Sequence, residues 1–266
     1  MKTPMRLYKY QAYSSFALEA LIQKKIWVSN PTDFNDPFDC RVRPPTIESR
    51  DEVLQLNDAL NRLKNPLYNP TGDDRPSLTL GHTYGEEYWE QPPEMLRTLL
   101  RGHGQQLVDW ITKLGVYSLT SSPNNLLMWA HYAAKHQGFV IGFDTSTLQL
   151  PESASLIPVQ YLGDYSEIDL ETLTDVTDGA EYLKNIAMRK GSQWSHENEW
   201  RLVYPEGGYL ANIPMQPVEV IFGHKMAQTH RHTLHSLICK QFTGVQFSIL
   251  KPSSTAFGLE PEPYTG

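Results

Sequence analysis

The stretch Trp194-Ser-His-Glu-Asn-Glu-Trp-Arg201 leads into a predicted buried β-strand that runs from Glu199 to Tyr204. If the strand is taken to begin at Glu197, alternate residues point to one face, which places Glu197, Glu199 and Arg201 together. The tryptophans on either side indicate burial, where charged groups need partners and are often functional. Arg201 could hold one carboxylate ionised through a bidentate bond while the other faces a cleft. A surface ion-pair ladder is the alternative interpretation.

Other short strands and helices surround this block without a regular strand–helix alternation. Strands are predicted at 6–10, 26–28, 116–120, 138–144, 156–162, 218–222 and 245–250. Helices are predicted at 16–24, 51–64, 95–113, 124–135, 180–190 and 226–240, and Ser14-Ser15 offers a cap for the first of them. This order favours an α+β fold with a central mixed, mainly antiparallel sheet and flanking helices. We expect one domain over residues 1–266, with a helical and irregular insertion at about 46–114 and a loose tail from about 252.

Composition narrows the class of protein. The chain has 266 residues, of which 40% are hydrophobic, and a formal net charge of −7, which argues against broad nonspecific nucleic-acid binding. Two cysteines give no disulfide framework or Cys-x-x-Cys metal site, and no run of about 18 apolar residues is present. We therefore expect a soluble, cytoplasmic protein without membrane contact.

Three further segments carry candidate functional groups. The helix around Met128-Trp-Ala-His-Tyr132 places Trp129, Tyr132 and His136 on one face, and their polar atoms need partners if buried. The loop Ser29-Asn-Pro-Thr-Asp-Phe-Asn-Asp-Pro-Phe-Asp39 is either a binding loop or a structural one. The histidines between 224 and 235 mix helical spacings, so we expect no metal site there. Neither a P-loop nor a dinucleotide-binding glycine motif is present.

Several of these blocks together resemble the bacterial and phage domain-of-unknown-function 2971 family, some of whose members resemble abortive-infection proteins. The resemblance extends from residue 6 to about residue 224. The blocks are Leu7-Tyr-Lys-Tyr10, Trp27-Val-Ser-Asn-Pro-Thr-Asp-Phe-Asn-Asp-Pro-Phe-Asp39, Met128-Trp-Ala-His-Tyr-Ala133 with His136-x-Gly-Phe139, and Trp194-x-x-Glu-x-Glu-Trp-Arg201.

The layout is also similar to the ADP-ribosyltransferase superfamily, whose split sheet binds NAD. That resemblance implies that Glu199 is the catalytic carboxylate and that Glu197, two residues earlier, acts as a general base or orients the acceptor. It implies that Lys9 or Tyr10 contacts the NAD ribose, although the family usually has His or Arg there, and that Tyr132 stacks on nicotinamide. The remaining residues expected to contact NAD are Ser29, Asn35, Trp129, His131 and Arg201.

Three functions remain open at this stage. The first is an NAD-dependent ADP-ribosyltransferase that modifies a macromolecular acceptor, nucleic acid or protein, in phage defence or as a toxin, with no metal required. The second is a non-catalytic sensor that binds a nucleotide or a partner. The third is a metal-dependent nuclease that would use Asp36, Asp39, Glu197 and Glu199.

Overall fold

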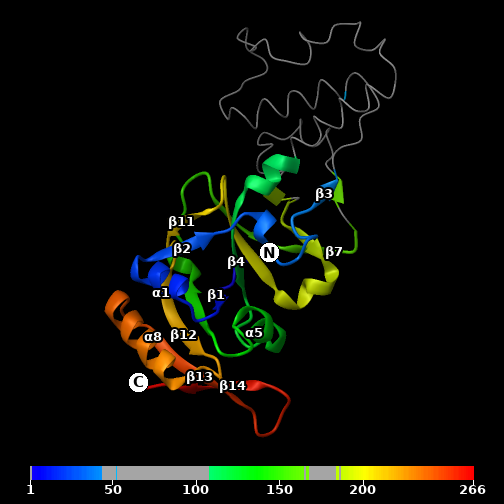
Figure 1. Ribbon diagram of the computed structural model, residues 1–266. Helices are drawn as coiled ribbons and strands as arrows, with labels where there is room; N and C mark the ends of the chain where they lie inside the picture. The colour runs from blue at the N-terminus through cyan, green and yellow to red at the C-terminus, as the bar shows by residue number, and fades with distance from the viewer. Residues whose placement is uncertain (1, 44–51, 53–107, 165, 168–183, 186) are drawn as a thin grey trace, which may run out of the picture. The chain divides into compact units, whose positions relative to one another are not determined.

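The computed structural model describes residues 2–43, 52, 108–164, 166–167, 184–185 and 187–266 (Figure 1). The chain divides into two compact units. Unit 1 comprises Met1–Asn30, Gly115–Val159 and Gln193–Gly266, and unit 2 comprises Pro31–Leu114 and Gln160–Ser192. The helix predicted at 51–64, apart from residue 52, and most of the helix predicted at 95–113 lie outside the described residues. The helix predicted at 180–190 is described at 184–185 and 187–190, and its end is wrong, because Arg189–Gly191 is a strand.

Unit 1 is built on an eight-stranded sheet formed by the described residues. Across the sheet the strands are ordered β14-β13-β12-β5-β1-β4-β10-β6. Their bounds are β1 Arg6–Gln11, β4 Gly115–Thr120, β5 Phe139–Asp144, β6 Ser155–Pro158, β10 Glu199–Tyr204, β12 Gln216–Phe222, β13 Gln246–Pro252 and β14 Leu259–Pro263. Neighbouring strands are antiparallel except β12 and β13, which are parallel and joined through α8 (Gln228–Gln241). The expected α+β fold with a mixed, mainly antiparallel sheet is confirmed.

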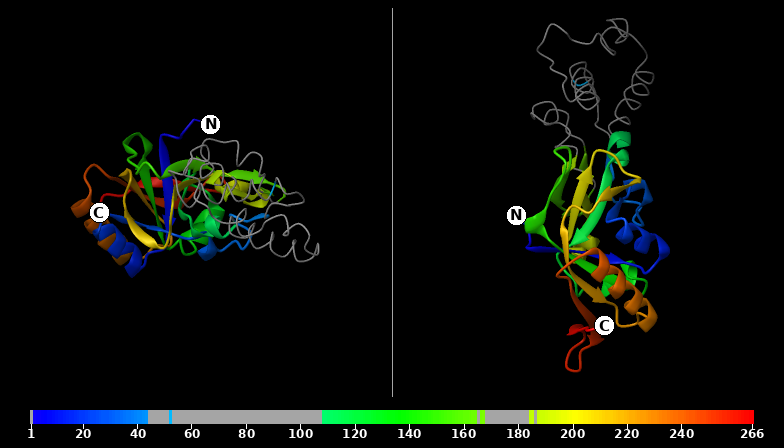
Figure 2. Two further views of the ribbon diagram at one scale, coloured as in Figure 1. Left: turned by 90° about the horizontal axis from the view of Figure 1, so that it is seen from above. Right: turned by 90° about the vertical axis from the view of Figure 1, so that its left-hand side faces the viewer.

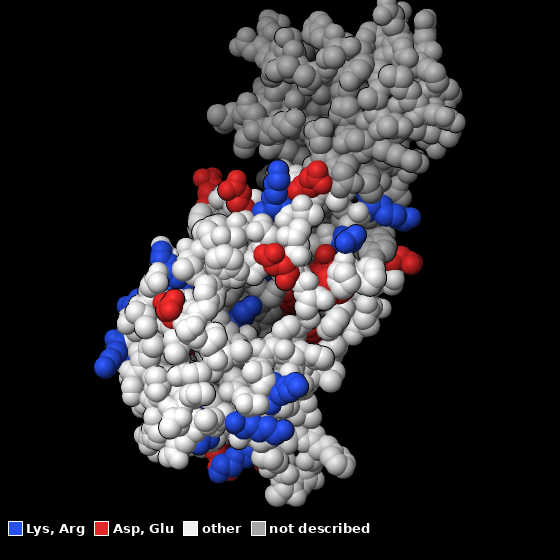
Figure 3. Space-filling model, viewed as in Figure 1, with Lys and Arg blue, Asp and Glu red and all other residues white. Residues whose placement is uncertain are grey.

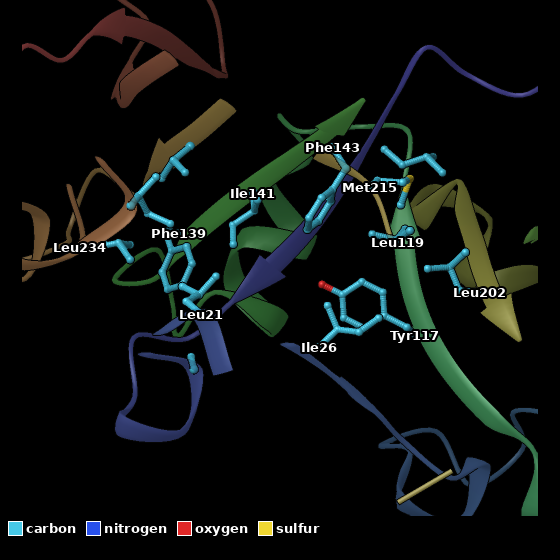
Figure 4. Packing of buried hydrophobic residues seen from close by; sticks show 14 of the residues in the cluster. Leu21, Ile26, Tyr117, Leu119, Phe139, Ile141, Phe143, Leu202, Met215 and Leu234 are labelled. Atoms are coloured by element: carbon cyan, nitrogen blue, oxygen red, sulfur yellow. The ribbon is translucent and has the colours of Figure 1, made fainter. Parts of the chain in front are cut away.

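Helices cover both faces of this sheet. α1 (Ser15–Ile22) begins at the predicted cap Ser14, whose hydroxyl accepts from the amide of Ala17, and it packs against α8 (Figure 2). Leu7 of β1 belongs to the hydrophobic core on this side, part of which Figure 4 shows. The next residue, Tyr8, belongs to a second cluster on the opposite face, which is covered by α5 (Leu126–Tyr132).

β1 and β4 make the shortest ladder of the sheet within the described chain. Tyr8 lies opposite Thr120, and the two strands pair at that position alone. β1 pairs with β5, its other neighbour, along its whole length from Arg6 to Gln11. Main-chain bonding is therefore weakest between β1 and β4, and side chains from both strands can enter the space between them.

The remaining strands form short pairs. In unit 1, β2 (Lys25–Val28) pairs with β11 (Tyr209–Asn212) outside the large sheet. In unit 2, β3 (Val42–Arg43) pairs with β8 (Ser166–Glu167), and β7 (Gln160–Leu162) pairs with β9 (Arg189–Gly191). Short 3-10 helices occupy Pro31–Asp33 (η1), Thr145–Thr147 (η3) and Ser192–Glu197 (η4).

The structure differs from the sequence-based expectations in two segments. The strand predicted at 156–162 is two strands, β6 and β7, which belong to different units because the chain leaves the large sheet after Val159. In the segment expected to be a loose tail, β14 adds to the edge of the sheet beside β13, where it satisfies the hydrogen-bonding groups of that strand. No helix in the described part of the chain has both the length and the apolarity needed to cross a membrane.

Candidate active site: a buried acid pair beside the junction of β1 and β4

Glu199 and Arg201 form a buried ion pair on one face of β10. Nε of Arg201 donates to Oε1 of Glu199 at 2.7 Å, and Nη2 donates to Oε2 at 2.9 Å. The arginine is fully buried and the glutamate is 5% exposed. Two parallel charge-assisted bonds of this length hold the carboxylate in one orientation and favour its ionised form. The predicted shared face of these two residues is therefore present in the strand.

Glu197 is not part of that strand, contrary to the periodicity expected from the sequence. It is the last residue of η4, and β10 begins at Glu199. The residue between them, Asn198, has a left-handed backbone with φ of 45°, so the alternation of a strand is interrupted there. Asparagine tolerates this conformation better than most residues. Glu197 reaches a buried position by this turn rather than by strand geometry.

The two acids nevertheless lie at the same end of β10. Glu197 is 2% exposed, and its Oε1 accepts a 2.7 Å hydrogen bond from the hydroxyl of Tyr132 at the end of α5. Its main-chain oxygen accepts from Oγ1 of Thr120 at 2.6 Å. Thr120 is also the residue opposite Glu199 in the ladder between β4 and β10. The end of β4 thus positions both glutamates.

Lys9 enters the space between β1 and β4. Its Nζ donates to the main-chain oxygen of Ser118 at 3.0 Å and lies 4.7 Å from the centre of the Tyr117 ring. Burial lowers the pKa of Lys9 to about 8; the negative charge of Glu199 opposes this change and the positive charge of Arg201 adds to it. The ammonium group therefore lies within the electrostatic field of the Glu199–Arg201 pair. In Figure 3 one face of the molecule is hollowed, and a Lys or Arg side chain lies at the bottom of the hollow.

The short helix α5 is fixed to the sheet by side-chain hydrogen bonds at its start. Oδ1 of Asn125 caps the helix by accepting from the amides of Leu127 and Met128, while its Nδ2 donates to the main-chain oxygen of His196 in η4 at 2.6 Å. The hydroxyl of Tyr10 donates to the oxygen of Ser122 at 2.9 Å and accepts from the amide of Asn125. The segment that carries Tyr132 is thus tied to both β1 and η4.

Trp129 is fully buried in this helix and serves packing. Its indole nitrogen donates to the oxygen of Pro123 at 2.8 Å, and its ring meets that of Tyr10 edge to face at 5.2 Å. Tyr132 points its hydroxyl at Glu197, as described above. His131 is exposed, with its ring 6.3 Å from that of Tyr132.

The structure brings together most of the residues predicted for the site. Those that lie around the junction of β1, β4 and β10 are Lys9, Tyr10, Trp129, Tyr132, Glu197, Glu199 and Arg201. Ser29 lies elsewhere in unit 1, because its main chain bridges to Val116 near the opposite end of β4. Asn35 is exposed and belongs to unit 2.

The acidic loop that contains Asn35 has its own buried contacts. Asp39 forms an ion pair with Lys190 of β9 at 3.2 Å, and both side chains are buried. Oδ1 of Asp36 accepts from the amide of Phe38, whereas its Oδ2 is buried and has no hydrogen-bond partner among the described residues. In the described part of the chain no three His, Cys, Asp or Glu side chains gather as metal ligands would.

Two residues of the site were not predicted from the sequence. Thr120 positions Glu197, and Asn125 connects α5 to η4. An asparagine directly before a helix is a recognisable cap signal, so its role toward α5 was accessible from the sequence. Its second hydrogen bond, to the main-chain oxygen of His196, depends on the fold and could not be predicted from the sequence.

Comparison with known proteins finds a family similarity over a segment that contains part of this site. Residues 128–202 match the family model described as "Protein of unknown function (DUF2971)". The match confirms the resemblance to this family over the segment that contains Tyr132, Glu197 and Glu199. Neither the curated proteins nor the solved structures include a significant match to the chain.

Proposed function

We propose that this protein is an NAD-dependent ADP-ribosyltransferase that acts on a macromolecular acceptor, with Glu199 as the catalytic carboxylate. The observation that supports this proposal is the bidentate Glu199–Arg201 pair, which keeps an ionised, oriented carboxylate next to the space between β1 and β4. Cleavage of the bond between nicotinamide and ribose develops positive charge on the sugar ring. A fixed carboxylate stabilises such a transition state without reorganisation.

The second acid, Glu197, lies where it can accept the proton of the incoming nucleophile. Nicotinamide leaves as a neutral molecule, the acceptor forms the new bond to the same sugar carbon, and the acceptor loses one proton. Glu197 is the general base to which we assign this proton. The hydroxyl of Tyr132 orients Glu197 through its 2.7 Å bond, which gives Tyr132 a positioning role in place of the stacking role that the resemblance implies.

Lys9 of β1 contributes a positive charge to the site that contains the two acids. Its amine lies between the strands and experiences the charges of Glu199 and Arg201. As an ammonium at neutral pH, it is suited to bind an anionic or hydroxyl-bearing part of a dinucleotide. We assign Lys9 to substrate binding and not to the chemical step.

A sensor without catalysis is the second candidate. The observation that favours it is that both carboxylates already have hydrogen-bond donors, Arg201 for Glu199 and Tyr132 for Glu197. In that case the acids stabilise the fold, and a nucleotide binds near Lys9 without being cleaved. The nuclease stays an untested prediction.

The test is to incubate the purified full-length chain with labelled NAD and cell lysate, and to measure nicotinamide release and label transfer. We expect release by the wild type and at least a hundredfold lower rate for Glu199→Gln, since one catalytic charge accounts for roughly this factor. The matched control is Glu219→Gln, because Glu219 lies in the same sheet and also pairs with an arginine, Arg6, at 3.3 Å. Full turnover by folded Glu199→Gln would refute the assignment.

The same purified wild-type protein, mixed with NAD, distinguishes the sensor from the transferase. Thermal stabilisation by NAD without any release of nicotinamide favours the sensor over the transferase. Label transferred to nucleic acid or to protein identifies the acceptor class.

A further inference from the structure

Two imidazole rings meet where the turn after α5 contacts the loop before α8. The rings of His136 and His224 lie edge to face, with 5.1 Å between their centres and 64° between their planes. Nδ1 of each ring is buried and has no hydrogen-bond partner in the described part of the chain. A buried polar atom without a partner is costly, and a charge at the same place costs more. The pair therefore favours the neutral state of both rings.

The turn that carries His136 has an uncommon backbone. Three successive residues, Ala134, Lys135 and His136, have φ values of 47°, 55° and 70°. Residues with a side chain adopt this left-handed region at a cost of roughly 1 kcal/mol or more each, so surrounding contacts must hold the turn in place.

Those contacts come from the loop that includes His224. The amide of Lys225 donates to the oxygen of His136 at 3.1 Å, and the amide of Gly223 donates to the oxygen of Gly138 at 2.9 Å. The approach is close: a Cβ atom on Gly223 would lie 2.2 Å from the oxygen of His136. The strained turn is thus held against the loop by main-chain bonds next to the histidine pair.

The ring of His136 also connects the turn to the candidate active site. It lies parallel to the ring of Trp129, with 8° between the planes and 6.3 Å between the centres. Trp129 is fully buried in α5, three residues before Tyr132. This ring contact connects the turn to the helix whose last residue places its hydroxyl on Glu197.

We propose that the His136–His224 pair is a pH-sensitive switch whose protonation releases the turn after α5 and weakens the Tyr132–Glu197 hydrogen bond. The charged group that faces the pair is Lys225, which is positive and opposes protonation. The claim that the switch regulates catalysis rests on the proposed function. The claim that protonation releases the turn does not.

The direction of the effect follows from the pKa values. Burial, and then the charges of His224 and Lys225, lower the pKa of His136 below its usual 6.5; burial and Lys225 lower that of His224. The unfolded chain therefore takes up protons first as the pH falls. Stability decreases as the pH drops through about 6.5, and the loss is complete below the folded-state pKa values.

The test compares the wild type with the double variant His136→Phe and His224→Phe, which keeps both rings but cannot be charged. The matched control is His230→Phe, because His230 is exposed and its ring stacks on Tyr13 at 4.0 Å. Melting temperature and hydrogen exchange of residues 126–136, corrected for the intrinsic rate, are measured at pH 7.5 and pH 5.5.

We expect the wild type and the control to lose about 4 °C more than the double variant on acidification. Their corrected exchange in α5 should rise at least threefold, whereas that of the double variant stays constant. Equal responses of all three proteins, or no response of the wild type, would overturn the switch. If the double variant does not fold, NMR titration of the wild type decides: midpoints of His136 and His224 below the usual 6.5 support the switch, and midpoints at 6.5 refute it. Absence of NAD turnover in every protein at both pH values would contradict the proposed function and leave the exchange result standing.

Discussion

The hydroxyl of Tyr132, at the end of α5, donates a 2.7 Å hydrogen bond to a carboxylate oxygen of Glu197, a residue 65 positions further along the chain. This bond connects the helix that covers one face of the sheet to the acid pair at the start of β10. It also joins two of the sequence blocks that carry the resemblance, Met128-Trp-Ala-His-Tyr-Ala133 and Trp194-x-x-Glu-x-Glu-Trp-Arg201.

Replacing Tyr132 with Phe removes only this hydroxyl. We expect the free energy of unfolding to fall by about 1–3 kcal/mol, because the buried oxygen of Glu197 loses a donor. We also expect NAD turnover to fall at least tenfold, with most of the change in kcat, since in the proposed mechanism Tyr132 orients the general base of the chemical step. Urea unfolding and steady-state kinetics measure the two effects. A purely structural Tyr132 would change stability and leave kcat as it is.

The Glu199–Arg201 pair predicts a large difference between two similar substitutions. Arg201→Met leaves the buried carboxylate of Glu199 without its cation and should destabilise the protein by about 3–5 kcal/mol. Arg6→Met breaks a pair whose arginine is 46% exposed and should cost less than about 1 kcal/mol.

The double variant Glu199→Met with Arg201→Met provides the cross-check for this ion pair. It should be more stable than Arg201→Met alone, because the buried carboxylate is removed together with the guanidinium that bound it. Chemical denaturation of the wild type, Arg201→Met, Arg6→Met and the double variant measures these differences. Equal costs for Arg201→Met and Arg6→Met would show that burial does not determine the strength of the pair.

Lys9 gives the protein a pH dependence on the alkaline side. Its pKa is about 8 in the folded protein, below the ordinary lysine value of 10.5, so between these values the unfolded chain binds the extra proton. The contribution of Lys9 to stability is therefore complete above about pH 10.5 and is lost as the pH falls towards 8. Lys9→Met removes this dependence.

The measurement for Lys9 is the difference in unfolding free energy between Lys9→Met and the wild type at pH 7 and pH 9.5. We expect this difference to shift by about 1–2 kcal/mol in favour of the wild type at the higher pH. Lys25→Met is the matched control, because Lys25 is a half-buried lysine at the surface that donates to Asn212. A constant difference for Lys9→Met would contradict the low pKa.

The sequence predicted local features of the fold more fully than relations between distant segments. The cap at Ser14, the strand from Glu199 to Tyr204 and the class of the sheet all follow from short-range patterns, and the structure confirms them. The position of β14 does not follow from such a pattern. A segment containing Pro261 and Pro263 reads as a loose tail, yet an edge strand tolerates proline because one side of it needs no ladder bonds.

In the candidate site, too, short-range patterns predicted local features but not contacts between distant segments. Periodicity correctly placed Glu199 and Arg201 on one face, but it failed for Glu197 because the left-handed turn at Asn198 separates that residue from the strand. Aromatic spacing singled out Tyr132 without revealing its partner. A 65-residue separation between donor and acceptor is a property of the folded chain, and spacing rules cover only neighbours along it.

Asn125 offers a way to separate the cap of α5 from its attachment to η4. Its Oδ1 caps the helix, whereas its Nδ2 donates to the oxygen of His196 at 2.6 Å. Asn125→Asp retains an oxygen for the cap and loses the donor to His196; Asn125→Ala loses both. Because His196 immediately precedes Glu197, the lost attachment should disturb the acid even where the helix remains capped.

We therefore expect Asn125→Asp and Asn125→Ala to reduce NAD turnover by similar factors, of about tenfold or more. Their stabilities should differ, with Asn125→Ala lower by about 1 kcal/mol because only it loses the cap. Circular dichroism, urea unfolding and nicotinamide release separate these effects. Wild-type turnover in Asn125→Asp would mean that the cap alone matters and that η4 holds Glu197 without the hydrogen bond from Asn125. That outcome would leave the Tyr132 bond as the connection on which the placement of Glu197 depends.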